Sequence, residues 1–115
     1  MPKRGNQPLH GEMLQGTLDL LILKTLAMGP AHGHTIAHAI ERGSEEVLQV
    51  EHGSLYPALH RLEQQGLISA EWSQTETGRD AKFYELTKTG RAALKSETAQ
   101  WERLSAAVGL VLRNA

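Results

Sequence analysis

Apolar residues recur at helical spacing in four stretches of the chain and alternate with polar residues in a fifth. The helical stretches are 14–28, 34–42, 53–66 and 87–112, and the alternation lies within 67–87. Spacings of three and four residues predict amphipathic helices, whereas two alternating runs separated by polar turn residues predict a β-hairpin. The pattern therefore predicts a mainly α protein with a small β-hairpin.

The stretch 53–68, GSLYPALHRLEQQGLI, separates into two faces if it is helical. Leu55, Leu59 and Leu62 share one apolar stripe. The side chains expected on or beside the opposite face are Ser54, Pro57, His60, Arg61 and Gln64. Ser54 as N-cap, with Pro57 in the first turn, would begin this helix, and Gly66 would end it. Its polar groups are of the kinds that contact base edges and phosphates, which indicates a recognition helix. Glu63 is expected to have a structural partner.

The elements predicted before and after this helix indicate the fold of the domain. A helix over 14–28 stops at Gly29-Pro30, and a short helix over 34–42 ends at Gly43, which we expect to be a left-handed cap. The hairpin follows, with Trp72 expected in the core. This order is that of a winged helix-turn-helix domain. We expect a flexible arm over 1–12, this domain over 13–87 and a dimerisation helix over 88–115.

The last helix, capped by Thr87, carries a row of positions spaced four and three residues apart. The row comprises Gly90, Leu94, Glu97, Trp101, Leu104, Val108 and Val111. Such spacing is typical of a coiled-coil-like contact between helices. The first helix is apolar on more than one side, so it has a second face to offer to another chain. Both helices therefore predict a homodimer.

The composition narrows the classes of function. The 115 residues include no cysteine, which excludes disulfides and thiolate chemistry. The net charge of −1 argues against a nucleic-acid binder, but charge is polarised, with acids concentrated in 36–51 and bases in 78–95. We find no membrane span or secretory leader pattern and expect a cytoplasmic protein without a cofactor.

Three alternatives remain beside DNA binding. His34 and His38 lie at i and i+4 with His32 close by, a spacing that suits a metal-responsive regulator or simply solvent-facing histidines. A winged helix can also bind only protein, although the polar face offers no apolar anchor. Enzymatic activity is not expected, because Ser54, His60 and Glu63 on one helix cannot form a relay and no catalytic motif is present.

Two motifs carry a resemblance to a known family. LYPALHRLEQQGLI at 55–68 and GRDAKFYELT at 78–87, with Gly90 following, resemble the LYPxLxRLExxGLI and GRxxKxYxLTxxG hallmarks of the PadR-type bacterial transcription regulators. The resemblance implies a repressor that binds an inverted-repeat operator as a homodimer. The DNA-binding residues that we expect are Ser54, Tyr56, Pro57, His60, Arg61, Gln64, Arg79 and Lys82. Asp80 and Glu85 make this wing less basic than is usual in the family.

The chain is similar to the short class of the family, in which the last helix packs against the first helix of the partner subunit. The dimerisation residues expected on this basis are Leu14, Leu18, Leu21, Leu94, Trp101, Leu104, Val108 and Val111. Some short-class members bind flat aromatic or drug-like effectors between paired tryptophans. Trp101 matches that position and Glu97 lies one turn before it, although Trp101 could equally fill a core.

Overall fold

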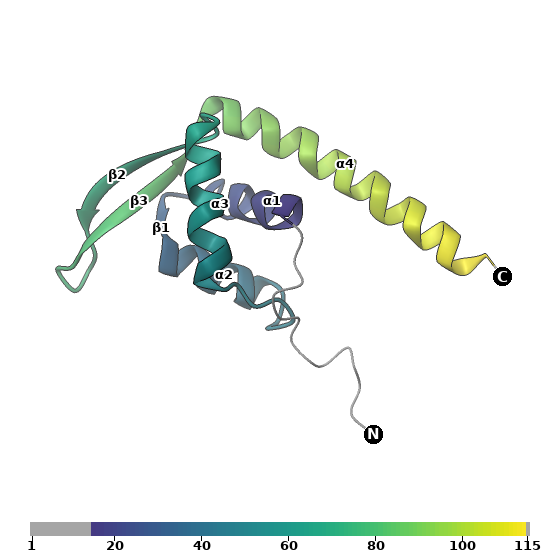
Figure 1. Cartoon of the computed structure of the whole chain (residues 1–115), viewed down its shortest axis with the longest axis horizontal. Coiled ribbons are helices and arrows are strands. Elements are labelled where there is room, and N and C mark those ends of the chain that lie inside the picture. Colours follow the sequence, from purple (N-terminus) through teal and green to yellow (C-terminus); the bar gives the residue numbers. More distant parts are fainter. Residues whose placement is uncertain (1–14, 115) are drawn as a thin grey trace, which may run out of the picture.

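The computed structural model describes residues 15–114, which form helices and a small antiparallel sheet (Figure 1). In chain order the elements are α1 (Gln15–Leu26), β1 (Ala31–His32), α2 (Gly33–Gly43), α3 (His52–Gln64), β2 (Ile68–Gln74), β3 (Asp80–Leu86) and α4 (Lys88–Arg113). The mainly α winged helix-turn-helix fold with a long last helix is confirmed. The two-residue strand β1, which sequence periodicity could not detect, adds to the hairpin in the order β1-β3-β2.

Helices α1, α2 and α3 pack around one aliphatic core. The predicted stripe Leu55, Leu59 and Leu62 is fully buried there. The other large side chains with almost no exposure are Ile22, Leu23, Leu26, Ile36 and Ile68. Since burying each such side chain stabilises the fold by about 1.5–3 kcal/mol, this cluster fixes how α3 sits on α1 and α2.

The hairpin continues the core only at its base. Ile68 pairs with Leu86 and Ala70 with Tyr84, and these pairs face the helices. Farther along the same face, Trp72 pairs with Lys82 and is 69% exposed. The expectation of a core position for Trp72 is therefore wrong. Alternation places it on the inward face correctly, but the hairpin projects past the helices that would cover it (Figure 1).

Two helix ends differ from the sequence prediction. Gly43 lies within α2, and the left-handed backbone falls instead on Glu45 and Glu46, at φ 53° and 65°. The Ser44 hydroxyl donates to the Glu41 carbonyl and accepts from the Leu48 N–H, while the Glu41 carboxylate accepts from Val50 N–H. These side-chain bonds hold the loop in place of a glycine cap.

The start of α3 also needs correction. The helix begins at His52 with Glu51 as N-cap, so Ser54 is not the cap and Pro57 lies beyond the first turn. Ser54 and Leu55 N–H groups donate to the Glu51 carbonyl, which places the first hydrogen bonds earlier than the Ser-Pro signal suggests. The predicted end is confirmed, because Gly66 takes a left-handed conformation at φ 75°.

Helix α4 begins as predicted and then leaves the rest of the molecule. The Thr87 hydroxyl accepts from Gly90 N–H at 3.0 Å and donates to Leu67 and Gly66 carbonyls, which ties the cap to the end of α3. Gly90 is buried against this junction, where an added Cβ would overlap the Leu67 carbonyl oxygen. Beyond it α4 extends away on the side of α3 opposite the hairpin (Figure 1). Within residues 15–114, no helix is long and apolar enough to cross a membrane.

Candidate nucleic-acid interface

The exposed face of α3 carries most of the predicted DNA-binding side chains. Ser54, Tyr56, Pro57, His60 and Gln64 are all exposed, on the side away from the buried leucines. The ring of Tyr56 lies against the first turn of α2, because an added Cβ on Gly33 would stand 2.7 Å from the Tyr56 hydroxyl. The glycine therefore permits this close packing of α2 on the recognition helix.

Arg61 does not share that exposed face, which corrects the sequence placement. Its guanidinium donates to the Asp19 carboxylate of α1 at 2.7 Å, and its Nε is buried without a hydrogen-bond partner. Ala58 of α3 is fully buried as well, so the core contact is wider than the leucine stripe and extends toward Arg61. The pair links α3 to α1 directly.

The environment of this pair limits how much it stabilises the fold. Burial raises the pKa of the Asp19 carboxyl above its ordinary value, while the hydrogen bond and charge of Arg61 act in the opposite direction. Desolvation therefore offsets much of the attraction, as is common for partly buried ion pairs. The ion pair therefore contributes more to the orientation of α3 on α1 than to the stability of the fold.

The two hairpin cations predicted to bind DNA, Lys82 and Arg79, differ in their surroundings. Lys82 Nζ lies 3.2 Å from the Glu63 carboxylate, which joins the hairpin to α3 and confirms a structural partner for Glu63. Arg79 is exposed at the hairpin turn, where its backbone N–H donates to the Thr75 hydroxyl. Gly78, at φ 82°, allows this tight turn. Arg79 is therefore the predicted hairpin cation best placed to contact a phosphate.

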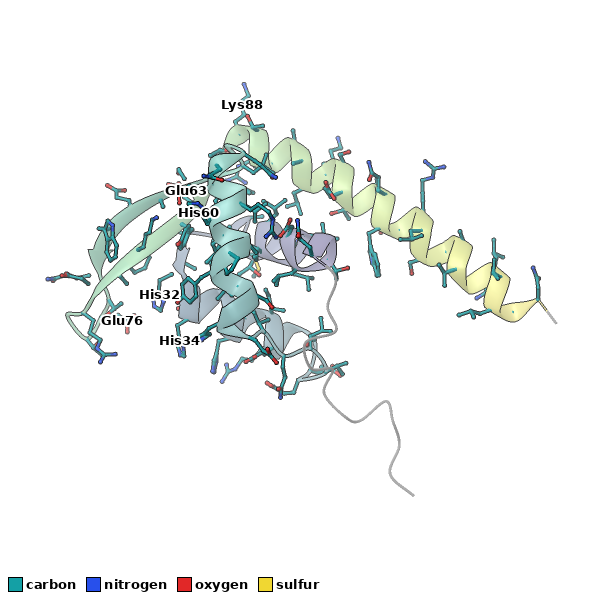
Figure 2. The ribbon with its side chains drawn as sticks, in the orientation of Figure 1. His32, His34, His60, Glu63, Glu76 and Lys88 are labelled. Atoms are coloured by element: carbon teal, nitrogen blue, oxygen red, sulfur yellow. The ribbon has the colours of Figure 1, made fainter. Side chains whose placement is uncertain are left out.

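Histidines gather near this interface. Figure 2 shows His32, His34 and His60 on the side of α3 where the hairpin lies. The ring centroids of His34 and His38 are 5.6 Å apart, and those of His32 and His34 are 6.4 Å apart. Residues 15–114 contain no group of three or more histidine or acidic side chains placed to hold a metal ion.

A hollow of about 390 Å³ lies between α1 and α4. Trp101 and Glu97, the two residues expected to bind an effector, both line it. The other residues that line this hollow were not predicted from the sequence to bind an effector. They are Gly16, Thr17, Leu20, Gln100 and Leu104. Leu20 was detectable, since it lies on the second apolar side of α1. Thr17 and Gln100 carry no such signal, because only the meeting of two distant helices makes them neighbours.

The predicted dimerisation residues separate into three groups. Leu18 is buried in the chain's own core together with Ile22 and Leu26, so it is not available to a partner and that prediction is wrong. Leu21 and Leu94 are partly buried against the same core. The last group is exposed on α4, and its members are Trp101, Leu104, Val108 and Val111. Leu14 lies outside the described residues.

Comparison with protein families agrees with this architecture. The model of a family described as the transcriptional regulator PadR-like family matches residues 22–96. The match runs from α1 through the hairpin into the first turns of α4. The transcriptional regulator Rv3488 of Mycobacterium tuberculosis is 34% identical over 94 residues, covering 82% of this chain and 84% of the relative.

Solved structures give the same result. The crystal structure of a PadR family transcriptional regulator from Eggerthella lenta is 33% identical, with a TM-score of 0.75 over 88% of this chain and 86% of that one. A PadR-like transcriptional regulator from Bacillus cereus is 25% identical, with a TM-score of 0.76 over 91% of this chain and all of the other. These neighbours are transcriptional regulators and not enzymes.

Proposed function

Because the chain belongs to the PadR-like family of transcriptional regulators, we propose that it is a homodimeric repressor whose two α3 helices bind an inverted-repeat operator. The family and the winged helix-turn-helix fold make it a DNA-binding transcription regulator. Repression, the symmetric operator and the dimer are the further steps of the proposal.

The observation that carries the proposal is the apolar row on α4. Trp101, Leu104, Val108 and Val111 lie at helical spacing on one side of a helix that projects from the molecule, and all are exposed. Contiguous exposed apolar surface of this kind marks a protein contact. Leu20 of α1 lines the hollow between α1 and α4 together with Trp101 and Leu104 of this row. The apolar surface therefore includes both helices, which supports α1 and α4 of a second copy as the surface that covers the row.

A two-fold dimer gives the DNA-binding face its geometry. Two recognition helices related by a two-fold axis enter successive major grooves about 34 Å apart, so the operator repeats as the protein does. Ser54, Tyr56, His60 and Gln64 contact bases or backbone, and Arg79 contacts a phosphate beside them. Arg61 acts indirectly by holding α3 on α1.

An aromatic effector fits the same dimer contact. Trp101 is 46% exposed beside the hollow of about 390 Å³, and Glu97 supplies an acceptor at its edge. A ligand releases DNA only if it binds more tightly to the dimer arrangement that cannot span both half-sites. In Trp72→Phe protein, where Trp101 is the remaining tryptophan, planar aromatic ligands that release DNA should change the indole emission. Release without any change would place the effector elsewhere.

The dimer is tested by charging the apolar row. Leu104→Asp with Val108→Asp should give monomers in sedimentation and lower DNA affinity by about 100-fold or more, because two linked contacts become one. The matched control is Ala106→Asp with Leu110→Asp, which adds the same charge on the opposite side of α4. A charged row that leaves the dimer intact, or a wild-type monomer, would refute the proposal. A reporter gene behind the bound site tests repression.

A further inference from the structure

Trp72 is an exposed aromatic side chain that the fold itself does not use. It is 69% exposed, against 46% for both Tyr56 and Trp101. The tryptophan side chain combines a large apolar ring with one N–H donor, and it is enriched where one side of the ring is covered by a partner. The register places Trp72 on the same face of the hairpin as Ile68 and Ala70, and Trp72 lines a hollow together with Tyr56 of α3.

A hollow of about 400 Å³ lies between this part of the hairpin, the first turn of α2 and α3. Trp72 lines it, and so does Tyr56 of the recognition helix. The remaining lining residues are His32, Gly33, His34, Asp80, Ala81, Lys82 and Tyr84. The hollow is thus continuous with the exposed face of α3, through the Tyr56 ring that the two share.

The charges around the hollow favour a partner that offers sugar and base surfaces as well as phosphate. Lys82 is the cation of the lining, and it already has a carboxylate partner in Glu63. The ring side chains Trp72, Tyr56 and His34 dominate what is left, with Asp80 as the acid of the lining. Aromatic surfaces beside donors suit deoxyribose and base edges better than isolated phosphate.

The second copy of the chain does not compete for this surface. Helix α4 and the hairpin lie on opposite sides of α3 (Figure 1), so a partner that covers Trp101 and Leu104 leaves the hairpin hollow open. A winged helix places its hairpin beside the backbone that flanks the groove holding the recognition helix. The DNA duplex is therefore the occupant that continuity with α3 supports.

We propose that Trp72 is a direct DNA contact, with its indole packed against the deoxyribose and base edges of the groove flanking each half-site. The proposal rests on the DNA-binding function and adds an uncharged aromatic anchor to it. This aromatic contact compensates for part of the phosphate contacts that the weakly basic hairpin does not make. Binding through Trp72 should therefore depend little on salt, unlike binding through Arg79.

The test uses the full chain and a duplex recovered by selecting genomic fragments with it. Trp72→Ala should weaken binding roughly tenfold, the loss expected when an aromatic anchor is truncated, without changing the slope of affinity against salt. Ser73→Ala, on the adjacent exposed residue facing the other side of the sheet, is the matched control and should bind as wild type does. Arg79→Ala should reduce the salt slope by about 1.

A second readout needs no truncation. DNA should protect the indole emission of the wild type from acrylamide, and this protection should be lost in Trp72→Phe, which retains Trp101, to a much greater extent than in Trp101→Phe, which retains Trp72. Equal affinities of Trp72→Ala and Ser73→Ala, or acrylamide protection that is as large in Trp72→Phe as in Trp101→Phe, would overturn the contact while leaving DNA binding intact. Failure of the wild type to select any DNA would refute the proposed function and this contact together.

Discussion

Helix α4 and the winged domain differ in how far their apolar side chains are buried. From Leu18 to Leu86 the aliphatic core residues are buried within the chain, whereas from Trp101 to Leu112 the large apolar residues of α4 are exposed. The apolar core of the domain is therefore covered within the chain, whereas the apolar side chains of α4 are not. The difference separates the residues that maintain the fold from those that we propose form the contact between two copies.

The largest effect should come from removing a leucine of the domain core. Leu59→Ala, at a fully buried position of α3, should lower the free energy of unfolding by about 2–5 kcal/mol through lost burial and the resulting cavity. Leu110→Ala makes the same substitution at an exposed position of α4 and should change it by about 0.5 kcal/mol or less. Urea denaturation followed by circular dichroism measures both. Similar losses for the two variants would remove the distinction between the regions.

A smaller loss of stability is expected at the junction between the domain and α4. Gly90→Ala should destabilise the protein by about 1–3 kcal/mol, because the new methyl group would overlap the Leu67 carbonyl and the Leu86 side chain. Gly109→Ala, on the same helix, meets only the end of the Arg113 side chain and should stabilise by up to about 1 kcal/mol through helix propensity. Thermal unfolding compares them, and a neutral Gly90→Ala would mean that α4 is not locked to the domain there.

The smallest effect concerns the ion pair that links α3 to α1 inside the domain. Arg61→Ala should cost roughly 1 kcal/mol of stability, because it leaves the partly buried Asp19 carboxylate without its partner. It should also weaken DNA binding without reducing the salt slope, since the guanidinium faces α1. The double variant with Asp19→Ala should recover part of both losses. A salt slope lowered by about 1 in Arg61→Ala would instead identify a phosphate contact.

Sequence periodicity predicted most of the fold because each main element has a clear apolar pattern. The stripe of Leu55, Leu59 and Leu62, the Thr87 cap and the alternation of the hairpin all depend on neighbours within one element. Strand β1 escaped prediction because two residues are too few to show a period. The Gly43 and Ser54 signals were misleading because side chains of Glu41 and Ser44 hold the loop, and because Glu51 and not Ser54 is the N-cap of α3.

The candidate site was harder to predict, because its details depend on contacts between elements. Arg61 lies at the border of the two α3 faces, and the position of Asp19 on α1 decides which way it turns. Trp72 has a core-type alternation, yet the length of the hairpin leaves it exposed. Leu18 fits a helical interface pattern as well as a core pattern, and only packing against α2 and α3 separates the two.

The most direct test of the account is hydroxyl-radical footprinting of the full chain on duplexes recovered by genomic selection, together with the stoichiometry of the complex. The account predicts two chains per site and two protected regions related by two-fold symmetry, with centres about one helical turn apart. A single asymmetric protected region occupied by one chain would contradict it.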